Sequence, residues 1–174
     1  MEVVKIEEIE ESYIKTFLEY LYSHLSENGT NNFFFLPLMK EQSNIGNNWE
    51  DKFRIGMKKQ LGEVGWRKLW VAKNGDNNII GHIDIRHRNE LNTQHRVVLG
   101  MGTDRHFRKK KVGQHLLEHV IAYCKKQTEI SWLDLDVMAN NIPAIRLYEK
   151  MDFKQLGYTA DMFRIHGRHT IIGL

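Results

Sequence analysis

The sequence predicts one α/β domain in which about four helices pack on a mixed sheet of about six to seven strands. Its 174 residues suit a single domain, and its 41% hydrophobic and 27% charged residues are ordinary for a soluble globular protein. Along the chain, the spacing of apolar residues changes from the helical period of about 3.6 to the alternation typical of strands. Late in the chain, a helix connects two strands; such a crossover makes them parallel, so the sheet is mixed.

The first part of the chain predicts a short strand and two helices. Residues 3–6 form the strand, and apolar residues recur at helical offsets over 10–25 and 49–61. Gly29 follows the first helix, and we expect it to cap that helix in a left-handed conformation. Between the two helices, Phe33–Phe35 either pack on the core or form the wall of a pocket.

The second part predicts most of the sheet. The strands fall at 68–72, 79–88 and 96–101, followed by a helix at 111–127, a strand at 131–138, a helix at 143–150 and a closing hairpin from 153, with its return strand at 165–172. Asp134 and Asp136 alternate with leucines in the strand at 131–138. Interior parallel strands are normally apolar on both faces, so the face with the two carboxylates is expected to border solvent or a cleft.

The stretch from Leu99 to Leu117 indicates phosphate binding. An apolar strand end leads through Gly100 and Gly102 into a basic loop, and this loop opens the helix at 111–127. The free N–H groups and the dipole of a helix N-terminus attract anions, and the basic side chains add full positive charges. Gly113 in the first turn lets another group approach the backbone closely. The alternative for such a basic run is a solvated loop or a weak nucleic-acid patch.

Composition limits the other classes of protein. The net charge of +3 is too small to predict a nucleic-acid partner, and no apolar run reaches the ~18 residues of a membrane span. The acidic N-terminus lacks the apolar centre of a signal peptide. The single cysteine, Cys124, cannot form a disulfide within the chain and is expected in the core. We therefore expect a cytoplasmic protein without a membrane or nucleic-acid partner and without a metal site.

Two motifs resemble those of the GNAT superfamily of acyl-CoA-dependent N-acetyltransferases. The family's Q/R-x-x-G-x-G/A loop is matched by residues 108–113, RKKKVG, and its N-x-x-A-x-x-L-Y-x-K-x-G-F motif by residues 141–153, NIPAIRLYEKMDF. Both lie at the spacing that the family requires, and the likeness covers roughly residues 66–174. Lys111 and Asp152 stand where the family usually has glycine. The resemblance implies a single domain over 1–174 in which two parallel strands splay apart to form the acetyl-CoA cleft.

The resemblance also assigns roles to residues. The residues expected to contact acetyl-CoA are Met101, Gly102, Thr103, Arg108, Lys109, Lys110, Lys111, Val112, Gly113 and Asn141. Gly100 and Gly102 would form a bulge there, and backbone N–H groups would polarise the thioester carbonyl. Tyr148 matches the family's general acid, which protonates the departing thiolate. Asp136 is the preferred general base.

The base and the acceptor stay open at this point. Asp134, His82 and Asp84 are alternatives to Asp136, because a protonated alkyl amine, with a pKa near 10, must lose a proton before it attacks. The aspartates favour a cationic acceptor, whereas Phe33–Phe35 and tryptophans would favour an apolar one. The expected function is transfer of an acetyl group from acetyl-CoA to a primary amine. The alternative is a regulatory or structural module that binds acyl-CoA, and a homodimer through the last strand fits either function.

Overall fold

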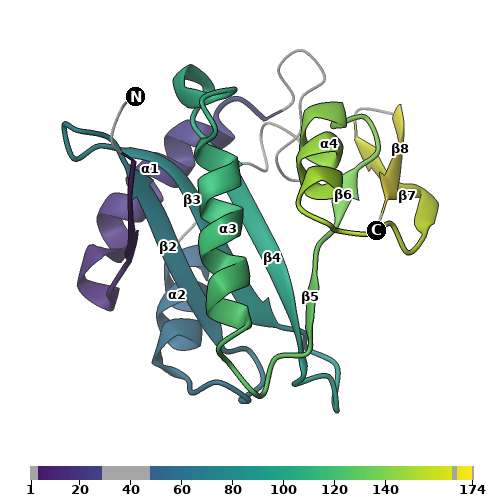
Figure 1. The fold of residues 1–174 in the computed structure, drawn as a ribbon, viewed down its shortest axis with the longest axis horizontal. Helices are drawn as coiled ribbons and strands as arrows, with labels where there is room; N and C mark the ends of the chain where they lie inside the picture. Colours follow the sequence, from purple (N-terminus) through teal and green to yellow (C-terminus); the bar gives the residue numbers. More distant parts are fainter. Residues whose placement is uncertain (1–3, 29–47, 166–167, 174) are drawn as a thin grey trace.

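The computed structural model describes residues 4–28, 48–165 and 168–173 (Figure 1). The elements in order are β1 (Lys5–Glu8), α1 (Ile14–Leu25), α2 (Asn48–Lys58), β2 (Arg67–Lys73), β3 (Ile79–His87), β4 (Arg96–Thr103), α3 (Val112–Cys124), β5 (Trp132–Asp134), β6 (Val137–Met138), α4 (Ile142–Lys150), β7 (Tyr158–Ile165) and β8 (Arg168–Gly173). The α/β class and the predicted order of elements are confirmed. The expected cap at Gly29 and the wall at Phe33–Phe35 lie outside the described residues.

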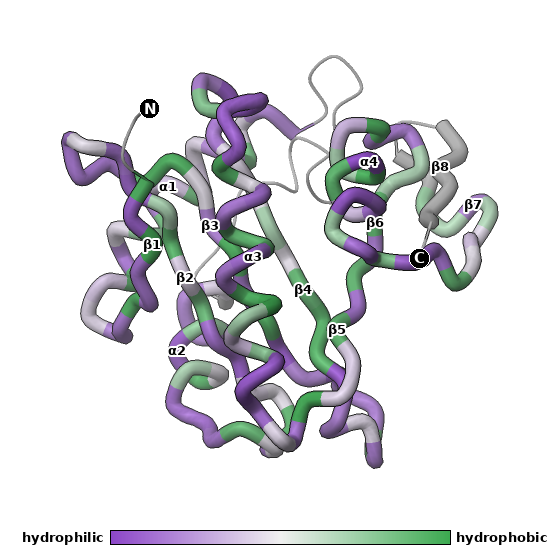
Figure 2. The backbone as a smooth tube through the Cα atoms, in the orientation of Figure 1, coloured by the Kyte–Doolittle hydropathy of each residue, from purple (hydrophilic) through white to green (hydrophobic). Residues whose placement is uncertain are grey.

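The main sheet has five strands in the order β1–β2–β3–β4–β5, and helices cover both of its faces. On one face, buried residues of α1 and α2 pack on Leu69 and Val71 of β2. On the other face, α3 packs on Trp70, Ile83 and Leu99. Figure 2 shows hydrophobic residues along the strands and on the turns of α3. Leu69 and Val71 face one layer of helices and Trp70 faces the other, because successive side chains of a strand point to opposite faces of the sheet.

The strands β4 and β5 pair in parallel for only three residues and then part. Their register runs from Arg96 opposite Trp132 to Val98 opposite Asp134. Beyond that point β4 continues to Thr103, whereas the chain after β5 leaves for a second sheet of order β6–β8–β7. The predicted splay of the two parallel strands is therefore present. Beyond Val98, no described strand pairs with the edge of β4 that faced β5, so another backbone can approach this edge.

Two details differ from the sequence prediction. The stretch 131–138 is not one strand, because Leu135 and Asp136 separate β5 from β6. The β3–β4 register is unbroken from Gly81 opposite Thr103 to His87 opposite Val97, so the expected bulge at Gly100 and Gly102 is absent from this described pairing. Gly100 instead leaves room for a neighbour: a Cβ atom there would lie 2.7 Å from Oδ1 of Asp84.

Candidate active site

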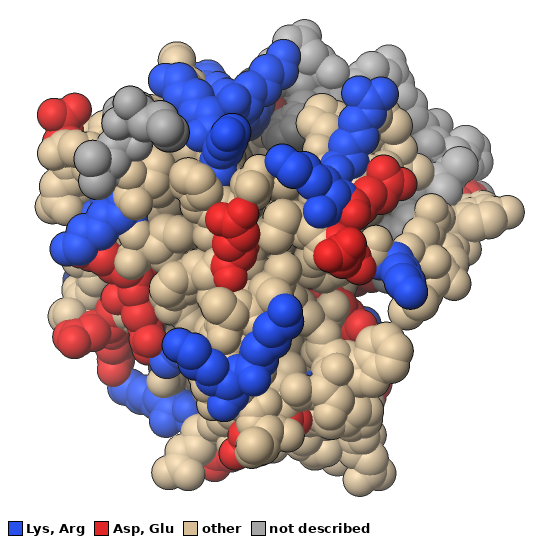
Figure 3. Space-filling model, viewed as in Figure 1, with Lys and Arg blue, Asp and Glu red and all other residues tan. Residues whose placement is uncertain are grey.

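The loop between β4 and α3 combines positive charge with an unusual backbone. Lys109 and Lys111 both have left-handed φ values, 62° and 65°. Lys111 is the N-cap of α3, and its own side chain makes no capping hydrogen bond within the described structure. The first N–H groups of α3 can therefore meet an anion. Figure 3 shows lysine and arginine gathered over this end of α3, as a phosphate-binding loop requires.

The two residues that replace family glycines adopt the conformation that glycine favours. Lys111 has φ 65°, and Asp152, just after α4, has the same φ. An L-residue in this region costs about 1–2 kcal/mol, which glycine avoids. Both replacements thus keep the left-handed turn at some cost in stability. Because Lys111 is exposed at the helix N-terminus, it also adds a charge where the family has none.

The first turn of α3 packs closely on α4. A Cβ atom on Gly113 would lie 3.2 Å from Cδ2 of Leu147 and 3.5 Å from Oγ1 of Thr103. Gly113 therefore brings α4 and the end of β4 against α3. At the start of α4, Oδ1 of Asn141 accepts a hydrogen bond from the N–H of Ala144, so Asn141 is the N-cap of that helix. The predicted contact residues Gly113 and Asn141 thus hold elements of the site together.

Arg108 is held by protein groups on both sides. Its Nε donates to the carbonyl of Thr103 at 3.3 Å, and its Nη2 donates to Oε2 of Glu27 at 3.0 Å. Oε1 of Glu27 also lies 3.8 Å from Nε of Arg105. Glu27 follows α1 and is largely buried. Arg108 therefore ties the basic loop to the end of α1, and Lys109, Lys110 and Lys111 supply the exposed charges.

Tyr148, the predicted general acid, lines a large cleft. The cleft has a volume of about 870 Å³ and lies between β5, α4 and the segment that follows α4. The ring of Tyr148 packs edge-on against Phe153 at 5.7 Å, and burial raises the pKa of the phenol to about 12. The phenol therefore keeps its proton at neutral pH and can donate a hydrogen bond.

The candidate bases lie in very different surroundings. Asp136 is exposed between β5 and β6 and does not line the cleft. Asp134 does line it, but Arg96 donates to both its oxygens at 2.8 and 2.7 Å. Asp84 is likewise paired with Arg67 at 3.3 Å and Arg86 at 3.2 Å. The assignment of Asp136 as base stays a prediction.

His82 lies in a buried cluster beneath α1. Its Nδ1 is 3.3 Å from the hydroxyl of Tyr20, and the ring also packs edge-on against Phe17 and His24. Burial lowers the pKa of both His82 and His24 to about 3. The close packing of the buried rings of Tyr20, His24 and His82 favours a structural role for this cluster, and His82 as an alternative base stays a prediction.

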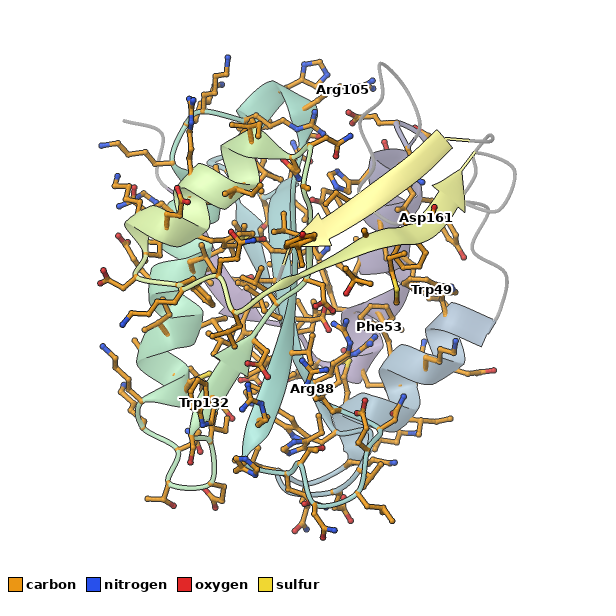
Figure 4. The ribbon with its side chains drawn as sticks, turned by 90° about the vertical axis from the view of Figure 1, so that its right-hand side faces the viewer. Trp49, Phe53, Arg88, Arg105, Trp132 and Asp161 are labelled. Atoms are coloured by element: carbon orange, nitrogen blue, oxygen red, sulfur yellow. The ribbon has the colours of Figure 1, made fainter. Side chains whose placement is uncertain are left out.

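The predicted acetyl-CoA contacts in β4 and the basic loop lie at the end of the main sheet where α3 begins. The cleft lies at the β5 edge of that sheet, toward the start of β4. Figure 4 looks onto this edge: Arg105 of the basic loop lies at one end, and Arg88 and Trp132 lie below the β7–β8 hairpin. Sequence reasoning missed Arg88 and Arg96, which line the cleft together with Asp134. The alternation of β3 offered a signal, since Arg88 follows His82, Asp84 and Arg86 at steps of two.

Comparison with known proteins establishes the class. The model of the acetyltransferase (GNAT) family matches residues 18–153, which is most of the chain. The chain therefore belongs to the GNAT acetyltransferase family. In the described residues, no helix is long and apolar enough to cross a membrane.

Individual relatives are more distant. The chain is 26% identical over 90 residues to the L-amino acid N-acetyltransferase AaaT of Escherichia coli K12, and this match spans 52% of the chain and about half, 54%, of that protein. A GNAT acetyltransferase of Streptococcus pneumoniae has a similar structure, with a TM-score of 0.81, 17% identity and coverage of 98% and 96% of the two chains. A chimera of the spermidine N-acetyltransferase SpeG from Vibrio cholerae and hSSAT has a TM-score of 0.70 and 17% identity. That match covers 97% of this chain and 92% of the chimera. At these identities, the two structures show a common fold.

Proposed function

We propose that this chain, as one domain over 1–174, transfers an acetyl group from acetyl-CoA to a primary amine within a ternary complex. The observation that carries this proposal is the parting of β4 and β5 beside the basic start of α3. Among the described strands, none pairs with this edge of β4 at Met101, Gly102 and Thr103. The family membership and the N-acetyltransferases among the similar proteins support an amine as acceptor.

The residues divide the work along the sheet. Lys109, Lys110 and Lys111 hold the phosphates with the N–H groups of Val112 and Gly113. The N–H groups at the open edge of β4 polarise the thioester carbonyl, and one oriented donor of this kind contributes about 3 kcal/mol. Acetyl-CoA supplies the activated acetyl group.

The chemistry needs two proton transfers. The amine nitrogen forms the new bond to the carbonyl carbon and gives up a proton to a base, for which Asp136 or a water chain leading to it is the candidate. The carbon–sulfur bond breaks, the hydroxyl of Tyr148 gives its proton to the departing sulfur, and the phenolate then regains a proton from solvent. The raised pKa of Tyr148 keeps this proton in place at neutral pH. The products are an amide and free CoA.

A thermal melt with and without acetyl-CoA tests the proposal. At about 100 times the dissociation constant, binding adds about 2.7 kcal/mol, or roughly 5–10 °C in Tm for a domain of this size. Acetate alone should give no shift. Release of free thiol in the presence of a panel of amines then shows transfer. A shift without thiol release would instead support an acyl-CoA-binding module, and no shift would overturn the proposal.

A further inference from the structure

Asp84, in the middle of β3, lies on the face of the main sheet that α1 and α2 cover. Its partner in β2 is Leu69, which packs under these helices, and its partner in β4 is Gly100. Residues opposite each other in neighbouring strands share a face of the sheet. Only 10% of the Asp84 side chain is exposed. The carboxylate therefore lies beside Gly100, next to the edge at Met101–Thr103 where we propose that the thioester binds.

The two oxygens of Asp84 have different surroundings. Nε of Arg67 lies 3.3 Å from Oδ2, and Nη1 of Arg86 donates to the same oxygen at 3.2 Å. Arg67 also lies over the ring of Phe53 at 4.2 Å, on the α2 side of β4 (Figure 4). Among the described residues, no hydrogen bond reaches Oδ1. The arginines thus hold one oxygen of the carboxylate and leave the other without a donor from the described chain.

Gly100 allows this second oxygen to lie over β4. A Cβ atom on Gly100 would lie 2.7 Å from Oδ1 of Asp84, which is too close for any side chain. The φ of Gly100 is not left-handed, so the backbone itself does not require glycine here. Glycine in a strand often marks the close approach of another group. Gly100 is partly exposed, so a ligand can reach the place where Oδ1 lies.

Oδ1 is within reach of a thioester held at the edge of β4. It lies within about 8 Å of the Cα atom of Met101, because consecutive Cα atoms are about 3.8 Å apart. A carbonyl group bonded to this edge, an amine about 3 Å from the carbonyl carbon and one hydrogen bond from the amine span a similar length. An amine that attacks the thioester can therefore contact Oδ1.

The other candidate bases are less suited to this contact. Arg96 donates to both oxygens of Asp134 at 2.7 and 2.8 Å, which are the lengths of strong charge-assisted bonds. Asp136 is exposed, and His82 is held among buried rings. The contacts of Asp84 with its arginines are longer than those of Asp134. Asp84 therefore combines a fixed, buried position with an oxygen that can accept a further hydrogen bond.

We propose that Oδ1 of Asp84 binds the ammonium group of the acceptor and takes its first proton, so that a neutral amine attacks the thioester. This inference rests on the proposed acetyl transfer and adds a catalytic residue to it. An alkyl ammonium, with a pKa near 10, has to lose two protons to become an amide. Asp84 takes the first before the attack and returns it to solvent as the product leaves. The second leaves the nitrogen while the carbon–nitrogen bond forms and the carbon–sulfur bond breaks, the step for which Asp136 is the candidate.

The pH dependence of kcat/KM separates this role from a structural one. The parent protein binds the ammonium form, so its kcat/KM for an alkyl amine should change little between about pH 6.5 and 8.5. In Asp84→Asn only the neutral amine reacts, and kcat/KM should rise about tenfold per pH unit over the same range. The acceptor is the alkyl amine of the panel that gives the fastest thiol release.

Other groups on this face do not produce such a slope. The described groups there that carry charge or titrate are Arg67, Arg86, Arg88, Arg96, His82 and Asp134 on or beside the strands, and Tyr20 and His24 in α1. Arginines stay charged at these pH values. Burial lowers the pKa of both histidines to about 3 and raises that of Tyr20, so these three side chains stay neutral. Asp134 is tested by its own variant.

Asp134→Asn is the matched control for Asp84→Asn. The side chain of Asp134 is also 10% exposed and is also paired with two arginines. At pH 7, kcat/KM of Asp84→Asn should be about a hundredfold below that of the parent protein, with the Kd of acetyl-CoA unchanged. Asp134→Asn should lose stability but keep the flat pH profile. A loss by the same factor at every pH in Asp84→Asn would show a structural role and overturn the inference.

Gly100→Ala tests the same geometry with Asp84 in place. Its Cβ atom would displace Oδ1 from over β4, so kcat/KM should fall about tenfold or more, with the Kd of acetyl-CoA unchanged. Gly75→Ala, with nothing within 4 Å, should match the parent protein. Full turnover by folded Gly100→Ala overturns the inference, and so does a slope that appears in Asp136→Asn instead of Asp84→Asn. Failure of the proposed function shows differently, as no melting shift with acetyl-CoA and no thiol release by the parent protein with any amine.

Discussion

Replacement of Lys111 by glycine should raise stability and weaken acetyl-CoA binding at the same time. Lys111 combines a strained backbone with a useful charge: its φ is 65°, and its side chain is exposed at the start of α3. Glycine relieves the strain and removes the charge. The relief of strain is measured as a change in Tm and the loss of charge as a change in the Kd of acetyl-CoA, so one variant can test both effects.

The magnitudes follow from the backbone and from the charge. Relief of a left-handed L-residue gains about 1–2 kcal/mol, while the freer unfolded chain of glycine costs about 0.4–1 kcal/mol. The net gain of about 0.5–1 kcal/mol raises Tm by about 1–4 °C. An exposed ion pair contributes about 0.2–1 kcal/mol, so the Kd of acetyl-CoA should rise by up to about fivefold.

Lys111→Ala is the matched control, because alanine removes the charge and keeps the strain. Its Tm should stay near that of the parent protein, and its Kd should rise as in Lys111→Gly. Melting curves and calorimetric titration with acetyl-CoA, at low and high salt, give both quantities. The reasoning is refuted if Lys111→Gly melts lower than Lys111→Ala, or if neither variant binds acetyl-CoA more weakly.

Three further variants test the packing, the buried histidines and the loop contact. Gly81→Ala would place a Cβ atom 2.9 Å from Cγ1 of Val112 and should lower the free energy of unfolding by about 1–3 kcal/mol in urea, whereas Gly75→Ala, with nothing within 4 Å, should not. The pKa of His24 is lowered to about 3, so below about pH 6.5 the unfolded chain binds a proton that the folded chain does not, and stability falls as the pH falls. In His24→Gln, the slope of the free energy of unfolding against pH should become flatter by up to about 1.4 kcal/mol per pH unit. An unchanged slope contradicts this prediction. Glu27→Gln should lower the free energy of unfolding by about 1–2 kcal/mol, because it weakens the Arg108–Glu27 ion pair that holds the basic loop. An unchanged urea midpoint would show that solvent already screens this ion pair.

The fold could be predicted because its signals are local. The helical spacing of Val112, Leu116 and Val120 places one face of α3 in the core, and these three residues are buried as expected. The crossover helix α3 made β4 and β5 parallel. The break at Leu135 and Asp136 was not predictable in the same way, because alternation continues through it in the sequence.

The site could be predicted only where a motif carried it. The left-handed turn at Lys111 occupies the position where the motif has glycine. The contacts of charged side chains were missed, because their partners are far apart in the chain. Arg108 and Glu27 are separated by 81 positions, and Arg96 and Asp134 by 38. An aspartate on a strand looks like a free charge in the sequence, and only the packed sheet shows which arginines neutralise it.

The most direct test of acetyl transfer compares thiol release by the parent protein and by Tyr148→Phe at saturating acetyl-CoA. The phenol lines the cleft, and its loss removes a proton donor while the ring still packs on Phe153. We predict that kcat falls about a hundredfold, as for the loss of a general acid, with the Kd of acetyl-CoA unchanged. Full turnover by Tyr148→Phe would contradict the assignment of Tyr148. Absence of thiol release from the parent protein with every amine would contradict the transfer itself.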